Sequence, residues 1–278
     1  MREAEDAAAR KQPAPAASAP YLRVRGVGKT FHSARGDVTA LEGIDIDIAK
    51  GEFVSILGPS GCGKSTLLRC VAALEEISAG AVEIEGRSID EPPEDIGIVF
   101  QRDVLLDWRT VIDNVLLPVE FRRLDTKKWR HRALELLATF EIDDFADRFP
   151  WELSGGMRQR VAICRGLILD PDLLLMDEPF GALDAITRDE LNLELERIWE
   201  STRKTILFVT HSIPEAVFLS DRVVVMSRNP GRVVETMAVD LPRPRTLDLR
   251  ETPEFGRYAG HVRTIFEGLG IMRRNKRQ

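Results

Sequence analysis

The segment Gly58–Ser65 most constrains what this chain can fold into, because it fits the phosphate-loop pattern G-x-x-x-x-G-K-[ST]. The apolar run Phe53–Leu57 leads into it and predicts a buried strand, and apolar residues at helical spacing follow in Lys64–Leu74. A glycine-rich turn between a strand and a helix directs backbone N–H groups inward, at the positive end of the helix dipole. The sequence therefore predicts an anion-binding loop in an α/β fold; the alternative is a glycine-rich turn before an ordinary helix.

This loop is expected to hold the phosphates of a nucleotide. Lys64 would reach the β- and γ-phosphates, and Ser65 would hold Mg²⁺. Cys62 stands at a variable position of the pattern, where we expect a small filler residue. The residues of the loop expected to contact the nucleotide are Gly58, Pro59, Ser60, Gly61, Cys62, Gly63, Lys64, Ser65 and Thr66.

The composition of the 278 residues argues against several classes of protein. A net charge of −6 and a pI near 5.5 argue against a nucleic-acid binder that relies on bulk charge. No run approaches the roughly 18 apolar residues of a membrane span. The N-terminal residues contain no continuous apolar stretch, so we expect no secretory signal. Cys62, Cys70 and Cys164 lack metal-ligand spacing, so we expect reduced thiols in the cytosol.

Strands and helices are predicted to alternate along the chain. Leu22–Val27 is expected to be a strand, and residues 38–40 and 44–48 two further pieces, the second half-exposed because apolar residues alternate there. Short apolar runs predict buried strands at 96–100, 173–176 and 205–210, whereas residues 110–149 show only helical spacing. This order predicts a parallel sheet covered on both faces, with a helical insertion.

Two acidic residues follow the apolar run Leu173–Met176. Ligands bind at the carboxyl edge of a parallel sheet, so Asp177 and Glu178 are expected beside the phosphate loop. Asp177 would act on Mg²⁺, and Glu178 would polarise the water that attacks the γ-phosphate. The alternative is a strand that ends in two solvated acids.

The segment Leu153–Arg160 resembles the signature motif of the ATP-binding-cassette (ABC) ATPases, and it lies just upstream of the acidic strand, as in that family. The other family motifs match in order. Gln101 resembles the Q-loop glutamine, Asp184 the D-loop aspartate, and His211 the switch histidine. Phe31 matches the aromatic residue that stacks on adenine. The resemblance covers roughly residues 21–241.

The resemblance implies a fold and a chemistry. The fold is an α/β P-loop NTPase with a parallel-sheet core, an antiparallel β subdomain and an inserted α-helical subdomain. The chemistry is ATP hydrolysis, with Lys64 on the phosphates, Glu178 as general base and His211 at the γ-phosphate. The Mg²⁺ ligands it implies are Ser65, Gln101 and Asp177.

A second phosphate-gripping loop is expected at Ser154, because a hydroxyl and two glycines precede a helix there. The resemblance implies a head-to-tail homodimer, in which this loop of one subunit closes over the ATP held by Lys64 of the other. The nucleotide contacts expected from this side are Ser154, Gly155, Gly156 and Asp184.

Three segments are expected along the chain. Residues 1–20 are rich in Ala and Pro, with almost no large apolar side chain, which predicts a disordered tail. Residues 21–241 would form the ABC ATPase domain, with the helical subdomain inserted at about 102–155. Residues 242–278 would form a C-terminal extension.

Within the family, Gly97–Gln101 and Leu105–Val111 resemble the nitrate, sulfonate and taurine import group, in which Pro typically stands at the place of Asp107. This implies an energy-coupling subunit, peripheral on the cytoplasmic face of the inner membrane, that drives uptake of a small anion such as sulfonate, taurine or nitrate. Its partners would be permease subunits and, indirectly, a periplasmic or extracellular solute-binding protein; no nucleic acid is expected. The apolar residues expected at the permease surface are Leu105, Leu106, Trp108 and Val111.

Two other functions stay open at this stage. One is a soluble ABC ATPase with no role in transport, of the assembly-scaffold type. The other is an exporter or cell-division cassette. A neighbouring permease gene and a binding-protein gene would favour import.

Overall fold

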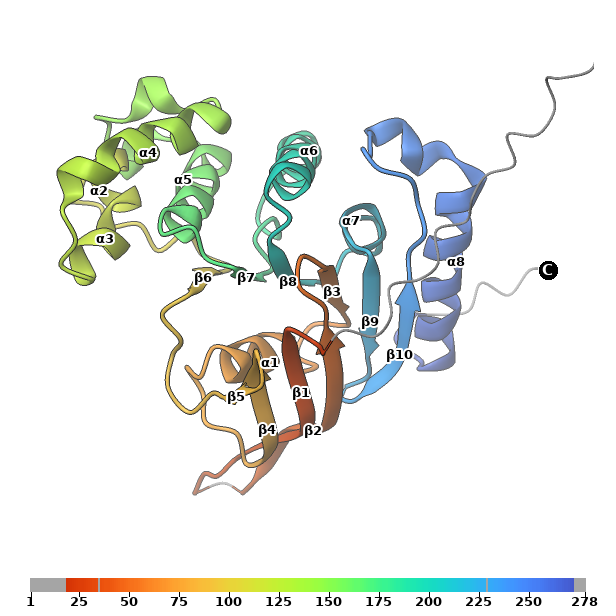
Figure 1. Cartoon of the computed structure of the whole chain (residues 1–278). Coiled ribbons are helices and arrows are strands. Elements are labelled where there is room, and N and C mark those ends of the chain that lie inside the picture. The colour runs from red at the N-terminus through yellow and green to blue at the C-terminus, as the bar shows by residue number, and fades with distance from the viewer. Residues whose placement is uncertain (1–18, 35, 229, 273–278) are drawn as a thin grey trace, which may run out of the picture.

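The computed structural model describes residues 19–34, 36–228 and 230–272, so most of the tail expected at 1–20 lies outside the described residues. The strands of its central sheet are β3 (Phe53–Leu57), β6 (Ile96–Val99), β7 (Leu173–Asp177), β8 (Thr205–Thr210), β9 (Arg222–Met226) and β10 (Val233–Ala238). They lie in the order β10-β9-β3-β8-β7-β6, all parallel except β10 (Figure 1). The carboxyl ends of β3, β6, β7 and β8 therefore meet at one edge.

A second, antiparallel sheet has four strands in the order β2-β1-β4-β5. The strands are β1 (Leu22–Phe31), β2 (Val38–Ile48), β4 (Ala79–Ile84) and β5 (Arg87–Ser88). Ile44, Ile46 and Ile48 are buried while Asp45 is exposed, as the alternating pattern predicts. The two pieces expected at 38–40 and 44–48 are one strand, because both pair with β1 across irregularities in register.

The helices surround the two sheets. They are α1 (Lys64–Val71), α2 (Val111–Val115), α3 (Leu117–Phe121), α4 (Thr126–Thr139), α5 (Gly155–Leu167), α6 (Ala185–Thr202), α7 (Ile213–Leu219) and α8 (Pro253–Gly268), with 3₁₀ turns η1 (Asp143–Phe145), η2 (Pro150–Glu152) and η3 (Leu247–Glu251). α1 lies between the sheets, while α6 and α7 cover the other face of the central sheet (Figure 1). α2, α3 and α4 lie within the segment predicted as a helical insertion, and α5 follows them before β7. Among the described residues, none of these helices has the length and apolar character to cross a membrane.

The central sheet separates two apolar clusters, and β7 shows why its sequence is continuously apolar. Leu173 and Leu175 belong to the cluster shared with α1 and the antiparallel sheet, whereas Leu174 and Met176 belong to the cluster with α5 to α8. All four are fully buried. A strand covered on both faces needs apolar residues at every position, and so the predicted buried strands are confirmed.

The apolar patch expected on the insertion is partly wrong. Val111 is fully buried, because it is the first residue of α2 and packs in the core between α2 and α5. Leu105 is half-buried against the same core. Trp108, by contrast, is 73% exposed. The four residues expected at the permease surface therefore cannot all form it, because Val111 is not accessible to a partner.

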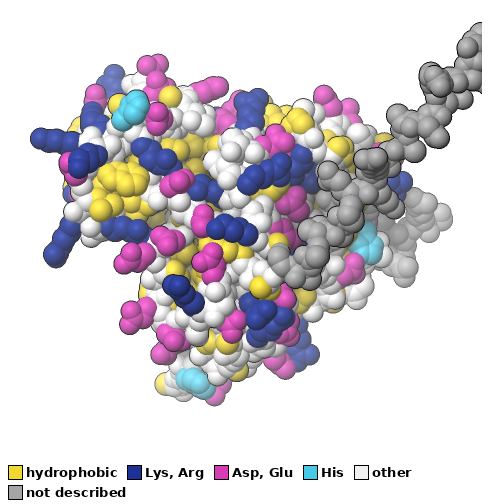
Figure 2. Space-filling view, in the orientation of Figure 1, with side chains coloured by type: hydrophobic (Ala, Val, Ile, Leu, Met, Phe, Trp, Pro, Cys, Tyr) yellow, Lys and Arg dark blue, Asp and Glu magenta, His cyan; other side chains and the backbone are white. Residues whose placement is uncertain are grey.

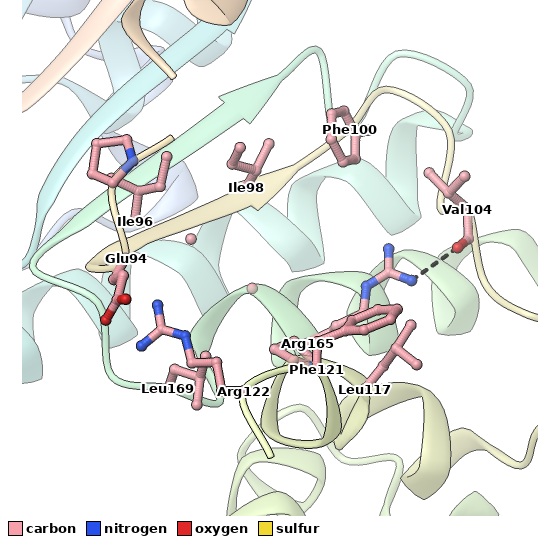
Figure 3. A pocket seen from close by; sticks show the side chains of 14 residues that line it. Glu94, Ile96, Ile98, Phe100, Val104, Leu117, Phe121, Arg122, Arg165 and Leu169 are labelled. Carbon is pink, nitrogen blue, oxygen red and sulfur yellow. Dashed lines mark hydrogen bonds between the residues drawn. The ribbon is translucent and has the colours of Figure 1, made fainter. Parts of the chain in front are cut away.

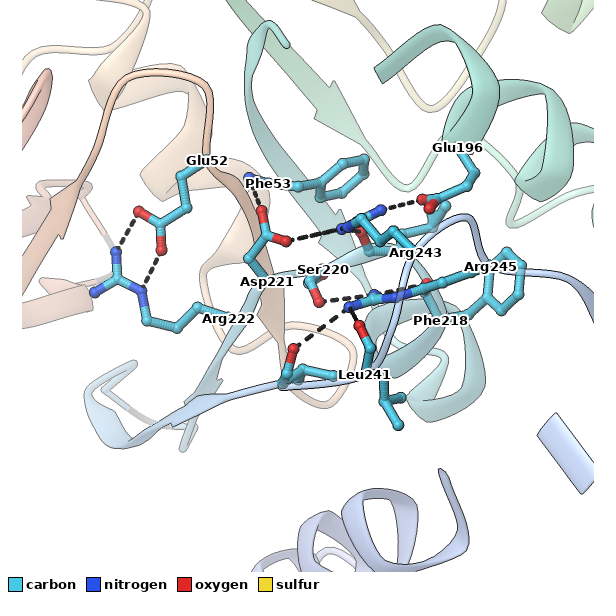
Figure 4. A network of polar contacts seen from close by, with 12 residues as sticks. Glu52, Phe53, Glu196, Phe218, Ser220, Asp221, Arg222, Leu241, Arg243 and Arg245 are labelled. Carbon is cyan, nitrogen blue, oxygen red and sulfur yellow. Dashed lines mark hydrogen bonds and ion pairs between the residues drawn. The ribbon is translucent and has the colours of Figure 1, made fainter. Parts of the chain in front are cut away.

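The segment after Leu241 is tied to the core by two arginines (Figure 4). Arg243 pairs with Glu196 of α6 and with Asp221, whose carboxylate lies 3.0 Å from Arg243 Nη2. Arg245 is 3% exposed, and burial lowers its pKa to about 10. Its guanidinium donates to backbone carbonyls only, those of Val217, Phe218, Ser220, Val239 and Leu241. Removing such a donor would leave buried carbonyls unpaired, at about 1–3 kcal/mol each.

Candidate active site

The phosphate loop takes the conformation that its glycines permit. Gly63 has φ 98° and caps α1. A Cβ there would lie 2.9 Å from Ala40 O, and one at Gly58 would lie 2.8 Å from Cys62 Sγ. Larger side chains would therefore strain or displace the loop. Cys62 is buried beneath it, and burial raises the pKa of its thiol.

A cavity of about 350 Å³ opens at this loop, at the carboxyl edge of the central sheet. Its lining includes residues from β2, from the loop and from the ends of two other strands, which the fold brings together. The lining residues are Val38, Thr39, Ala40, Ser60, Gly61, Gly63, Lys64, Ser65, Thr66, Gln101 and Glu178.

Lys64 is the buried charge of this cavity. Its side chain is 3% exposed, and its Nζ donates to Gly58 O at 3.0 Å and Pro59 O at 3.1 Å. The same Nζ lies 3.1 Å from Glu178 Oε1. A buried ammonium needs such partners. A ligand that binds Lys64 in place of Glu178 must therefore offer anionic oxygens that bind the ammonium as strongly as this carboxylate does.

Asp177 and Ser65 place two oxygens side by side. Ser65 Oγ donates to Asp177 Oδ1 at 2.7 Å. Burial raises the pKa of Asp177, against the lowering effect of that hydrogen bond. Asp177 ends β7, as predicted, with its carboxylate directed to α1.

Glu178 lies between Lys64 and His211. Its Oε2 is 3.0 Å from His211 Nδ1, while Oε1 contacts Lys64, and its side chain is 13% exposed. Its backbone has φ 43°, which a non-glycine residue rarely adopts. Such strain is held in place by the surrounding structure and is common at active sites.

His211 is positioned by a polar network that the sequence did not suggest. Thr210 Oγ1 donates to Glu215 Oε2 at 2.6 Å and accepts from Ser212 N at 3.0 Å. Ser212 caps α7 by accepting from Glu215 N. Glu215 was missed, although Ser212-x-x-Glu215 is a capping-box pattern that marks a helix start.

The remaining predicted residues lie outside the lining of this cavity. Ser154 caps α5 through Met157 N, and both Ser154 and Gly155 are exposed, whereas Gly156 is buried against Thr187. Asp184 is exposed and caps α6. Phe31 is 40% exposed and pairs in register with Val38, which does line the cavity. One chain thus assembles the phosphate-loop half of the predicted site.

Comparison with known proteins decides the family. A family model described as "ABC transporter" matches residues 41–181. The "Taurine import ATP-binding protein TauB" of Rhizobium johnstonii is 45% identical over 251 residues, covering 88% of this chain and 93% of that protein. This chain belongs to the ABC transporter family. It is an ATP-binding cassette that hydrolyses ATP, and the predicted fold class is confirmed.

Two further matches agree with this assignment. The "Nitrate import ATP-binding protein NrtD" of Synechococcus elongatus is 43% identical over 228 residues, covering 81% of this chain and 83% of that protein. A solved structure, described as the dimeric structure of MJ0796, a bacterial ABC transporter cassette, has a TM-score of 0.72 and 34% identity. It covers 80% of this ABC cassette and is itself covered completely.

Proposed function

We propose that this ATPase is the energy-coupling subunit of an importer that drives uptake of a small anion, such as taurine, a sulfonate or nitrate. The observation that carries the proposal is the pair of relatives named for taurine import and nitrate import, each matched over more than four fifths of both chains. On this proposal the protein is peripheral on the cytoplasmic face of the inner membrane. Separate permease subunits carry the solute, which a solute-binding protein delivers.

The geometry supports distinct roles for three residues. Glu178 would accept a proton from the attacking water. Because the γ-phosphate and Glu178 both offer anionic oxygens to Lys64 Nζ, the phosphate competes for the ammonium, and ATP binding frees the carboxylate for its role as base. His211, which lies 3.0 Å from Glu178, would then contact the γ-phosphate.

We further propose that Ser65, Asp177 and Gln101 hold Mg²⁺. Ser65 Oγ and Asp177 Oδ1 lie 2.7 Å apart, and Gln101 lines the same cavity. Hydroxyl, carboxylate and amide oxygens are the ligands that Mg²⁺ accepts, together with water and phosphate oxygens, so the residues fit the ion. When bound, the ion supplies positive charge to the β- and γ-phosphates.

The site is proposed to be completed by a second copy of the chain. Ser154, Gly155, Gly156 and Asp184 do not line the cavity at Lys64 of their own chain, and the similar MJ0796 cassette is described as dimeric. These four residues would contact the nucleotide of the partner subunit.

The ATPase domain would span residues 21–241, with the helical subdomain at about 102–155. Residues 242–278 would form the extension.

A groove beside the insertion is the proposed docking site for the permease (Figure 3). It measures about 400 Å³ and lies between β6, α3 and α5. Phe121 and Val104 line it with 79% and 55% exposure, and hydrophobic side chains are visible over the insertion in Figure 2. An apolar groove of this kind suits an amphipathic helix, here a cytoplasmic helix of the permease.

Phe121→Asp is expected to abolish co-purification of the chain with its permease from solubilised membranes. The carboxylate would become buried and unpaired against the docked helix, which we expect to weaken binding by about 10²-fold or more. Because Phe121 is exposed, ATP hydrolysis by the purified chain should stay within about twofold of wild type.

Trp108→Asp is the matched control, since Trp108 is an exposed aromatic residue of the insertion that does not line the groove. It should leave co-purification intact. If Trp108→Asp blocks it and Phe121→Asp does not, the permease docks on the 105–108 surface instead. If the wild-type chain co-purifies only with a soluble assembly factor, the importer proposal is wrong.

A further inference from the structure

The segment 101–104 lies between two recesses, the nucleotide cavity and the groove beside the insertion. Gln101 lines the nucleotide cavity, and Val104 lines the groove beside the insertion. Asp103 stands between them in the chain. Phe100, the chain neighbour of Gln101, also lines the groove, so residues 100–104 form one stretch that borders both recesses.

Two arginines of α5 fasten this segment. Arg165 Nη1 donates to Val104 O at 2.8 Å, a bond drawn in Figure 3, and its Nη2 donates to Asp103 O at 2.6 Å. Arg158 Nε donates to Asp103 Oδ2 at 2.9 Å. The segment is thus held to the helix that Ser154 caps.

Arg158 makes a second contact at the other end of its guanidinium. Its Nη1 donates to Leu153 O at 2.8 Å, the carbonyl directly before Ser154. A guanidinium is planar and rigid, so its two ends cannot move independently. One side chain therefore fixes the distance between Asp103 and the start of the Ser154 loop.

The fastened segment is also strained. Val104 has φ 47°, in the left-handed region that a β-branched residue rarely occupies. A residue in that conformation persists only where its surroundings hold it, and the two bonds from Arg165 do so here. The hydrogen bonds from α5 therefore hold the segment in one conformation.

We propose that Arg158 is a positioning residue, which holds the Ser154 loop at a set distance from Asp103. The loop that closes over the partner's nucleotide then follows the segment that lines both recesses. The part of this inference that concerns the groove rests on the proposed function. The part that concerns the Ser154 loop rests on the proposed two-chain site but needs no permease, because it acts in ATP hydrolysis by the purified chain.

The test is Arg158→Gln in the purified full chain, with ATPase kinetics and the Kd for ADP as readouts. ADP binds at the phosphate loop, so its Kd should change less than about twofold, whereas kcat should fall about tenfold or more, since misplacing a group by about 1 Å can cost up to 10²-fold. Asp103→Asn should lower kcat similarly, and the double variant should lose little more, because both changes break one bridge.

Arg132→Gln is the matched control. Arg132 and Arg158 have the same side-chain exposure of 36%, and each donates to one carboxylate and to backbone carbonyl oxygen. Arg132 joins α4 to the end of α5, away from Ser154, so kcat of Arg132→Gln should stay within about twofold even if its Tm falls.

Two results would overturn the assignment. One is a kcat for Arg158→Gln no lower than that of Arg132→Gln. The other is a loss of ADP affinity as large as the loss of kcat, which would indicate general damage to the fold. Loss of kcat without loss of ADP affinity, in a chain that captures no permease, would refute the importer proposal and leave the role of Arg158 standing.

Discussion

Glu178→Gln is expected to lower the kcat of ATP hydrolysis by about 10²-fold or more while leaving ATP binding intact. Glutamine keeps the shape of the side chain and its contact with His211, but an amide cannot take a proton from water. The substitution also removes the carboxylate that competes for Lys64, so the variant should bind ATP at least as tightly as wild type. Steady-state kinetics and equilibrium ATP binding measure both effects.

The ATP-bound dimer should persist in this variant, because hydrolysis no longer removes the γ-phosphate that holds it closed. Size exclusion in the presence of ATP would show it. Glu52→Gln is a suitable control, since Glu52 pairs with Arg222 at the opposite end of β3, away from the cavity. Near-normal turnover in Glu178→Gln would remove Glu178 from the role of base.

Mixing two inactive subunits is expected to restore activity. Lys64→Ala damages the phosphate loop of one subunit, and Ser154→Arg damages the loop that closes over the other. Each homodimer then has two defective sites, whereas the heterodimer has one site with both defects and one with neither. With random pairing at equal amounts, about a quarter of all sites would be intact.

The readouts for the mixture are ATP hydrolysis and ATP-driven closure. Ser154 is exposed, so its replacement should cost the chain only the helix cap, about 1 kcal/mol, and the Ser154→Arg subunit should still bind ATP at its own Lys64. If proven heterodimers recover neither hydrolysis nor closure, the shared-site arrangement is contradicted.

Much of the fold was predictable because its strands are short and covered on both faces. Leu173–Met176 and Thr205–Thr210 read as buried strands and are buried strands, since every position on them meets one of two cores. Asp184 also caps α6 at its start, a role that its resemblance to the D-loop aspartate did not suggest.

What the sequence could not supply is proximity between residues far apart in the chain. Val111 is apolar and near Gln101, yet only packing with α5 decides that it is buried. Glu178 was expected beside the phosphate loop, but its direct ion pair with Lys64, between the ends of β3 and β7 on either side of β8, was not. The groove lined by Val104 and Phe121 needs the insertion folded back toward β6. Local periodicity carries none of this information.

Solute uptake by cells that lack this gene tests the central claim most directly. Uptake of labelled taurine, an alkanesulfonate and nitrate would be measured in the deletion strain, and then after return of the wild-type chain or of Glu178→Gln. Uptake of one of these anions should be lost on deletion, restored by the wild-type chain and not restored by Glu178→Gln. If uptake of all three is unchanged by deletion, while the purified chain still hydrolyses ATP, its ATPase does not drive import of these solutes.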